Sequence, residues 1–155
     1  RPRDWSSDVC SSDLISEKCN AGFWLFGGKE EQDRLESLAL KVPHTTNLSG
    51  KLQLGEEIAV ISKLDLMISM DSSNMHIAAL TGTKVISIWG ATDPVIGFGA
   101  WNQPEDYSVF IPRSELSCRP CTVFGKGKCR RKDHACMKWL RPEMVYQKIE
   151  SLGIF

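Results

Sequence analysis

The chain has 155 residues, of which 42% are hydrophobic and 25% are charged, and its 19 Lys and Arg residues balance its 19 Asp and Glu residues. This composition predicts one ordinary globular domain rather than a disordered chain, and a net charge of zero argues against a general polyanion binder. No apolar run approaches the ~20 residues that a membrane helix needs, and the first thirty positions lack the order of a secretory signal. We therefore expect a cytoplasmic protein with reduced thiols.

The first 14 residues do not read as part of a fold. Ser and Asp recur from Asp4 to Leu14 without helical or strand periodicity. The stretch resembles the translation of a sequencing-library adapter, in which case the natural sequence starts near Ile15. The alternative is a polar, disordered tail. Both interpretations leave residues 1–14 outside the domain, which we predict to span residues 15–155.

Strands and helices are predicted to alternate along the rest of the chain. Short apolar runs closed by turn residues, typical of buried strands, occur at 23–26, 66–70, 85–89 and 107–111. Apolar residues at helical spacing predict helices after the first strand and at 54–64, 75–80 and 142–152. Alternation of this kind predicts an α/β fold with a mainly parallel sheet covered by helices on both faces. Such sheets bind ligands at the carboxyl ends of their strands.

The segment from Leu66 to Pro94 is the most informative. Its first strand ends in Asp71, Ser72 and Ser73, directly before a predicted helix. Backbone N–H groups at a helix N-terminus can bind phosphate oxygens, whereas the Asp71 carboxylate would repel phosphate and face a neutral hydroxylated group such as a sugar. An ordinary capped helix without a ligand explains the same residues, and the local pattern alone favours that alternative, because caps far outnumber phosphate sites.

Five motifs occur in one order between residues 21 and 152. They are Gly27-Gly28 with the acids that follow, Asn47-Leu48-Ser49-Gly50-Lys51, the run from Asp71 to Leu80 with Gly82-Thr83-Lys84-Val85, Trp89-Gly90-Ala91-Thr92-Asp93-Pro94, and Cys118-Arg119-Pro120-Cys121 with His134-Ala135-Cys136. Together they resemble the signatures of glycosyltransferase family 9, the ADP-heptose:lipopolysaccharide heptosyltransferases. Ser73, Trp89 and Ala91 depart from the family pattern. Ser73 matters most, because the usual Gly lets a phosphate approach the backbone closely.

The resemblance implies a fold and a reaction. The family has the two-domain GT-B architecture, and this chain resembles its C-terminal, Rossmann-like domain, which holds the nucleotide sugar. The acceptor and the general base would belong to the N-terminal domain, so this fragment alone would be inactive. The reaction would be inverting transfer of a heptose or similar sugar from a nucleotide diphosphate sugar such as ADP-heptose to a lipopolysaccharide core or related glycan acceptor. No cofactor would be required for catalysis. The implied location is the inner face of the inner membrane of a Gram-negative-type bacterium.

The resemblance also implies roles for the residues around the middle helix. Asp71 would hydrogen-bond sugar hydroxyls, while Ser72 and Ser73 would offer backbone N–H groups to the diphosphate. His76 would either contact the phosphates or support the loop, and the second role is favoured.

Further donor contacts are implied elsewhere in the chain. Glu30 or Glu31, just past the Gly pair, would accept hydrogen bonds from the ribose hydroxyls. Leu52 would contact the nucleobase through its main chain. Thr92 and Asp93 would line the cleft, although a plain turn capped by Pro94 explains them equally well.

Four cysteines fall within 19 residues of the last third, namely Cys118, Cys121, Cys129 and Cys136. One tight pair and two later thiols could form a tetrahedral structural zinc site, with His134 as a substitute ligand. Because no second tight pair occurs, the sequence leaves a zinc site and unligated or oxidisable thiols equally open.

Basic residues inside this Cys-rich segment, residues 118–136, offer a second class of function. They include Lys126, Lys128, Arg130, Arg131 and Lys132. A zinc-ribbon-like module with these charges could bind nucleic acid, but aromatic residues are not interleaved with them apart from Phe124. We therefore expect no nucleic-acid partner. The family resemblance instead implies anionic lipopolysaccharide precursor or a peripheral contact with the membrane surface. A third interpretation is a Rossmann-like fragment without activity.

Overall fold

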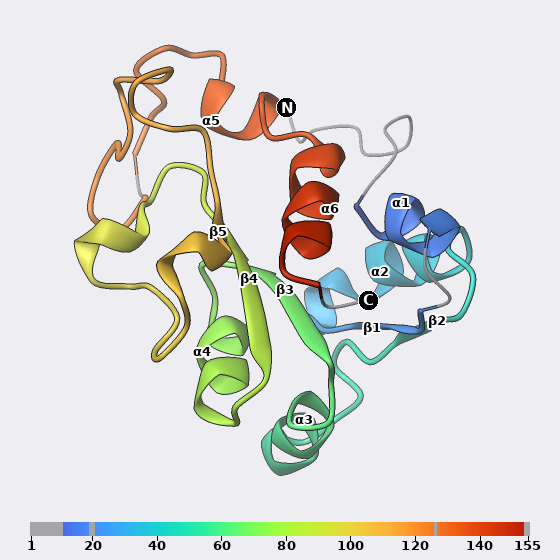
Figure 1. Cartoon of the computed structure of the whole chain (residues 1–155). Coiled ribbons are helices and arrows are strands. Elements are labelled where there is room, and N and C mark those ends of the chain that lie inside the picture. The colour runs from blue at the N-terminus through green and yellow to red at the C-terminus, as the bar shows by residue number, and fades with distance from the viewer. Residues whose placement is uncertain (1–10, 19–20, 126, 154–155) are drawn as a thin grey trace. The chain divides into compact units, whose positions relative to one another are not determined.

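The structure of the chain, a computed structural model, describes residues 11–18, 21–125 and 127–153 (Figure 1). Within these residues the chain forms two compact units, one ending at Gln53 and one beginning at Leu54. Parallel strands and helices make up both units, as the alternating pattern of the sequence predicts.

The first unit contains a two-stranded parallel sheet. Its elements are α1 (Ser11–Lys18), β1 (Phe23–Leu25), η1 (Lys29–Glu31), α2 (Gln32–Ala39) and β2 (Thr45–Asn47). β1 pairs with β2 from Phe23 opposite Thr45 to Leu25 opposite Asn47, because a helical crossover between two paired strands makes them parallel. The buried Asn47 joins sheet and helix: its Nδ2 donates to Gln32 O at 3.1 Å and to Glu36 Oε2 at 2.8 Å.

Two elements of this unit are not predicted by the sequence. α1 begins at Ser11 and so includes residues 11–14, which the sequence places in a tail, while residues 1–10 lie outside the described part of the chain. The adapter-like origin of residues 1–14 stays a prediction. β2 falls in a passage with turn residues on both sides. A strand of three residues is too short to show a period, although two adjacent β-branched Thr residues favour extended backbone.

The second unit contains a three-stranded parallel sheet in the order β3-β4-β5. Its elements are α3 (Leu54–Ile61), β3 (Leu66–Met70), α4 (Ser73–Leu80), β4 (Lys84–Ile88), η2 (Pro94–Ile96), η3 (Glu105–Tyr107), β5 (Ser108–Val109), α5 (Ala135–Lys138) and α6 (Pro142–Ser151). β3 pairs with β4 from Leu66 opposite Lys84 to Met70 opposite Ile88. α4 packs against β3 and β4, and α6 packs against β4 and β5; the two helices lie to either side of the strands in Figure 1.

β4 is the central strand and the most deeply buried one. Val85, Ile86 and Ser87 are all buried, as expected for a parallel strand covered on both faces. β5 pairs only with the last two residues of β4, Ser87 and Ile88. Further back, the side chain of Gln103 takes the place of a strand: it accepts from Val85 N at 3.1 Å and donates to Thr83 O at 3.2 Å. The edge of β4 is thereby hydrogen-bonded also in the part that precedes its pairing with β5.

The helix ends follow the signals in the sequence. α4 buries Met75, Ala78 and Ala79 and is followed by Gly82, whose φ of +84° is the left-handed conformation of a helix terminator. α6 has Pro142 in its first turn and buries Val145 and Ile149.

Three predictions about extent and burial are wrong. α3 ends at Ile61, one turn before Leu64, because the chain there closes into a turn in which Lys63 N donates to Val60 O at 3.0 Å. Leu54 begins the apolar face that predicts this helix, yet it is 64% exposed. The Trp24 side chain in β1, predicted to be a buried strand, is 48% exposed. α5 is a further element that the sequence does not predict. In the described part of the chain, no helix has the length and apolar character needed to cross a bilayer.

Candidate functional site

The loops after β3 and β4 meet at one edge of the sheet. The two strands are parallel neighbours in register, so both loops leave the sheet at the same end. The loop after β3 carries Asp71 and Ser72, and the loop after β4 carries Thr92. Asp71, Ser72 and Ser73 are exposed and Thr92 is half-buried. The structure therefore brings these four predicted donor-binding residues to a common edge.

Ser72 is the N-cap of α4 but does not cap it. Its backbone is extended, with φ −149° and ψ 167°, and among the described residues its side chain makes no capping hydrogen bond to the helix. Instead its hydroxyl lies 2.9 Å from Ser69 Oγ. The first-turn N–H groups of α4 and the positive end of its dipole are thus left without an N-cap side chain beside the exposed Asp71. This arrangement differs from the self-capped helix that the sequence left open as the alternative.

The remaining residues of α4 tie it to its neighbours. Asn74 Nδ2 donates to Glu57 Oε1 of α3 at 3.2 Å, and Ser73 Oγ approaches Asn74 Oδ1 at 3.5 Å. His76 lies in the following turn and is half-buried. Either role proposed for His76 stays a prediction.

The loop after β4 is held by the Cys-rich segment. The Arg119 side chain donates from Nε to Gly90 O at 2.6 Å and from Nη2 to Thr92 O at 2.8 Å, and Cys121 N donates to Ala91 O at 2.9 Å. Asp93 caps η2 by accepting from Val95 N at 3.1 Å, so the turn that the sequence offers as an alternative role for Asp93 does form.

Sequence reasoning missed Arg119 as a residue of this edge. It lies between two cysteines in a basic segment, and nothing in that pattern distinguishes a buried arginine from a solvated one. Only the tertiary structure shows that its side chain reaches the loop after β4.

Glu30, Glu31 and Leu52 belong to the first unit, at the carboxyl ends of β1 and β2. Gly50 N donates to Gly27 O at 3.1 Å and holds the two loops together. Glu31 Oε2 accepts from Gly28 N at 3.2 Å. Leu52, in the turn before α3, is half-buried.

The Gly pair allows both carboxylates to fold back over the turn. A Cβ on Gly28 would lie 2.5 Å from Glu30 Oε1, and one on Gly27 would lie 2.9 Å from Glu31 Oε2. Larger residues would therefore displace the acids. Glu31 thus has a local backbone partner, whereas Glu30 presents an exposed carboxylate.

The four thiols of the Cys-rich segment interact with one another. Burial raises the pKa of Cys121, and the neighbouring Cys118 and Cys129 raise it further; burial likewise raises the pKa of Cys136. Cys129 differs, because a hydrogen bond from the backbone of His134 lowers its pKa. The thiols are chemically a zinc donor set. Among the described residues, however, no group of three or more His, Cys, Asp or Glu side chains is arranged to hold a metal ion. The zinc site stays a prediction.

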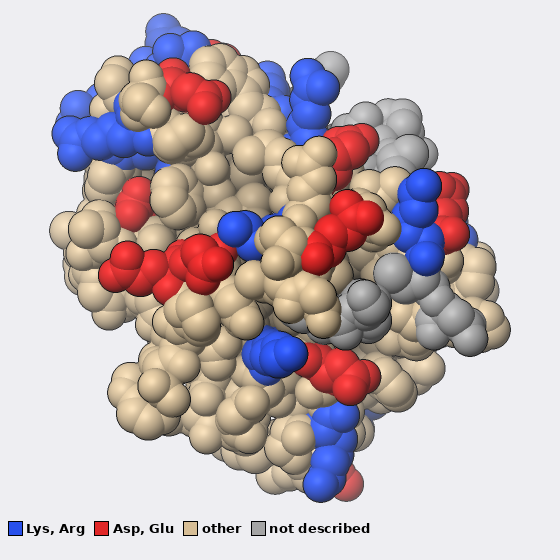
Figure 2. All heavy atoms as spheres, viewed as in Figure 1, with Lys and Arg blue, Asp and Glu red and all other residues tan. Residues whose placement is uncertain are grey.

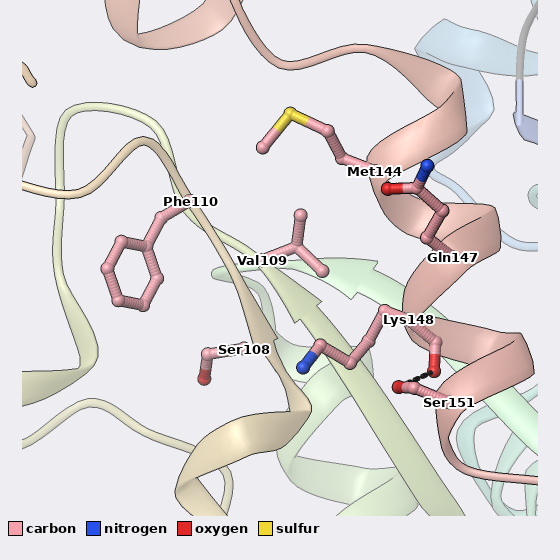
Figure 3. A pocket seen from close by; sticks show the side chains of 7 residues that line it. All are labelled: Ser108, Val109, Phe110, Met144, Gln147, Lys148 and Ser151. Carbon is pink, nitrogen blue, oxygen red and sulfur yellow. Dashed lines mark hydrogen bonds between the residues drawn. The ribbon is translucent and has the colours of Figure 1, made fainter.

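A cavity of about 330 Å³ lies apart from these loops, between β5 and α6. It is lined by Ser108, Val109, Phe110, Met144, Gln147, Lys148 and Ser151 (Figure 3). Lys148 extends from α6 toward the β5 strand, and Ser151 Oγ donates to Lys148 O at 2.8 Å. The lining includes none of the predicted donor-binding residues, so this cavity is separate from the candidate site.

Fold and site together define a class of protein: a Rossmann-like α/β domain of the GT-B type, with its candidate ligand-binding loops at the carboxyl ends of parallel strands. Two solved structures share the fold. A glycosyl transferase family 9 protein from Veillonella parvula matches with a TM-score of 0.69 and 17% identity, over 92% of this chain and 39% of that one. The Escherichia coli ADP-heptose lps heptosyltransferase II matches with a TM-score of 0.68 and 15% identity, over 92% and 39%. The predicted fold class is confirmed.

The chain belongs to glycosyltransferase family 9 (heptosyltransferase), whose family model matches residues 11–126. It is 30% identical to lipooligosaccharide heptosyltransferase 2 of Campylobacter jejuni, over 96% of this chain and 46% of that protein. It is 38% identical to the lipopolysaccharide core heptosyltransferase OpsX of Haemophilus influenzae, over 82% and 37%. The chain thus spans less than half the length of these curated relatives. The resemblance carried by the five motifs is confirmed.

Proposed function

We propose that the chain is the donor-binding half of an inverting glycosyltransferase, which moves a heptose or similar sugar from a nucleotide diphosphate sugar to a lipopolysaccharide core or related glycan. One observation carries the proposal. Ser72 leaves the first turn of α4 without a side-chain cap, next to the exposed Asp71 and at the edge where the loops after β3 and β4 meet. Membership of glycosyltransferase family 9 supports the reaction class.

The chemistry follows from these groups. The N–H groups of Ser72 and Ser73, with the dipole of α4, would bind the diphosphate oxygens. Asp71 would accept hydrogen bonds from sugar hydroxyls, since its charge disfavours a place beside phosphate. As the glycosidic bond to the nucleotide breaks, negative charge grows on the leaving diphosphate, and fixed N–H donors stabilise it without a metal ion or another cofactor. The base that activates the acceptor would lie in the part of the relatives that this chain does not match, so the chain alone should bind donor without turnover.

In the first unit, we assign the ribose hydroxyls to Glu30 rather than Glu31. Glu31 Oε2 already accepts from Gly28 N, which ties that carboxylate to the backbone of its own turn, whereas Glu30 is exposed. The main chain at Leu52 would contact the nucleobase of the donor.

We further propose that the Cys-rich segment contacts an anionic lipid surface at the cytoplasmic face of the inner membrane. Apart from the buried Arg119, it holds five basic residues and one acidic residue in a chain of zero net charge. Figure 2 shows Lys and Arg gathered at the upper left, over the region that Figure 1 draws in orange. Beside these charges, Val123 and Phe124 expose 51% and 69% of their surface. Charges flanking exposed apolar side chains are typical of interfacial membrane binding.

The donor site is tested by comparing two ligands on one substitution. Asp71→Ala should weaken binding of ADP-heptose about 10- to 100-fold, the loss expected for hydrogen bonds to a charged group, and should leave binding of ADP within about twofold. Isothermal titration calorimetry on the purified chain measures both. Asp65→Ala, at another exposed aspartate of the same unit, is the matched control. Equal affinity of wild type and Asp71→Ala for ADP-heptose would refute the assignment of Asp71.

A further inference from the structure

Arg119 is a charged residue enclosed by protein. Only 1% of its surface is exposed, which is rare for an arginine unless its charge and donors are matched. Its Nη1 donates to Ile111 O at 2.5 Å, in addition to the bonds from Nε to Gly90 O and from Nη2 to Thr92 O. Its guanidinium therefore joins three backbone carbonyls from two segments of the second unit.

Among the described residues, a carboxylate and an aromatic ring lie close to its guanidinium. The Asp93 carboxylate lies 3.6 Å from Nη2, and the Phe110 ring lies 4.9 Å from the guanidinium carbon. Burial lowers the pKa of Arg119, and Asp93 counteracts the shift. A guanidinium stays protonated in proteins all the same, so the three carbonyls and Asp93 face a permanent cation.

The loop after β4 is fixed at three consecutive residues. Gly90 and Thr92 bond to Arg119, and Ala91 accepts from Cys121 N at 2.9 Å. Packing is close as well. A Cβ on Gly90 would collide with Met137 Sδ, and one on Gly125 would lie 3.0 Å from Thr92 Cγ2. A connecting loop at a sheet edge is ordinarily mobile, but this one is matched to the Cys-rich segment at successive backbone positions.

We propose that Arg119 is a positioning residue that holds the loop Gly90–Asp93 in place for the donor, and that the Cys-rich segment is the support of that loop. This inference rests on the donor-binding function proposed above. A loop fixed before the ligand arrives loses less conformational freedom on binding. Arg119 would thus raise donor affinity without touching the donor.

Arginine is the one side chain suited to this task. Its planar guanidinium presents five N–H donors in a fixed arrangement, whereas the lysine ammonium is a compact point charge on a flexible stem. Arg119→Lys keeps the charge and cannot reach Gly90, Thr92 and Ile111 at once. The variant therefore separates the charge of Arg119 from its geometry.

The test combines a structural and a ligand readout on the 155-residue chain. In Arg119→Lys, amide hydrogen exchange should rise at least tenfold in residues 90–96 and stay unchanged in residues 66–80, and the affinity for both ADP and ADP-heptose should fall about tenfold. Arg113→Lys, at an exposed arginine of the same unit, should change neither quantity. Unchanged donor affinity in a variant with a loosened loop would overturn the proposal, and so would exchange that rises equally throughout the second unit.

Two further measurements keep the test decisive. If Arg119→Lys does not melt cooperatively, Asp93→Asn replaces it: asparagine retains the cap of η2 and removes only the charge paired with Arg119, so a smaller rise in exchange confined to residues 90–96 is expected, and no rise would refute the role. If the wild-type chain binds neither ADP nor ADP-heptose, the donor function fails, while the exchange data still report whether Arg119 fixes the loop.

Discussion

The loops after β3 and β4 lie at the same edge of one sheet and are built in opposite ways. After β3, Asp71 and Ser72 are exposed, and the Ser72 hydroxyl turns to Ser69 rather than to the helix that it begins. After β4, successive carbonyls are bound by a buried arginine and a neighbouring backbone N–H group. Within the described residues, the helix after the first loop has no N-cap hydrogen bond from Ser72 and lies next to an exposed acid, whereas backbone carbonyls of the second loop are hydrogen-bonded within the protein. The candidate site thus combines an exposed loop after β3, called the open loop below, with a loop after β4 that we propose is held rigid by Arg119.

The strongest test of this difference removes one backbone N–H donor from the open loop after β3. Ser73→Pro deletes the N–H group at the first position of α4, where proline is tolerated in helices, and the extended backbone of Ser72 suits a residue before proline. We expect ADP affinity to fall about 10- to 100-fold, the range for a hydrogen bond to a charged group, with the melting temperature nearly unchanged. Calorimetry and thermal unfolding measure the two effects.

Ser73→Gly is the matched control for that substitution. It keeps the N–H group and removes the side chain that narrows the approach to the backbone, so ADP affinity should be retained or should rise a few-fold. If Ser73→Pro and Ser73→Gly bound ADP equally well, the N–H group would have no part in binding.

On the rigid side, the segment that supports the β4 loop carries the basic surface. Replacing Lys128 and Lys132 together by Gln should weaken binding to vesicles that contain anionic lipid about tenfold or more, since each basic residue near such a surface contributes about 1 kcal/mol. Co-sedimentation at two salt concentrations checks this. Lys63→Gln with Lys84→Gln, which removes two exposed charges elsewhere in the unit, is the control. Salt-sensitive binding to single-stranded RNA in place of vesicles would support the rival nucleic-acid function.

The smallest expected effect concerns the thiols behind the rigid loop. A hydrogen bond from the backbone of His134 lowers the pKa of Cys129, while burial raises the pKa of Cys121. Since the thiolate is the reactive form and its fraction grows as the pKa falls, Cys129 should be alkylated by iodoacetamide several-fold faster than Cys121 near pH 7.5. Mass spectrometry of timed samples measures the order. Protection of all four cysteines until a chelator is added would instead identify a metal site, and elemental analysis would name the metal.

Local signals in the sequence were strong where a strand or helix shows its period and its ends. The strand at 66–70 and the helix with Pro142 in its first turn appear as predicted, because buried periodicity and terminating residues act within a few positions of each other. β2, α1 and α5 were missed. Each is short or lies in a polar passage, so tertiary contacts rather than a period decide its conformation.

The candidate site, too, was predicted only in part from the sequence. Asp71, Ser72 and Ser73 were predicted from a strand that ends before a helix, and the five ordered motifs predicted the family that the comparisons confirm. The capping state of Ser72 could not be predicted, because only the local geometry decides whether its hydroxyl bonds to the helix backbone or to the Ser69 hydroxyl. Glu31 was offered to the ribose, yet the structure gives it a partner three residues earlier in the chain.

The sequence by itself determined the family, the α/β class and the acidic and small residues that meet at the carboxyl end of β3, since these are properties of contiguous segments. The tertiary structure alone decided that Arg119 is buried and which carbonyls it binds, because Gly90 and Thr92 lie 29 and 27 residues away from it in the chain. A charged side chain becomes an internal support only when folding surrounds it with acceptors, and no local pattern records that event.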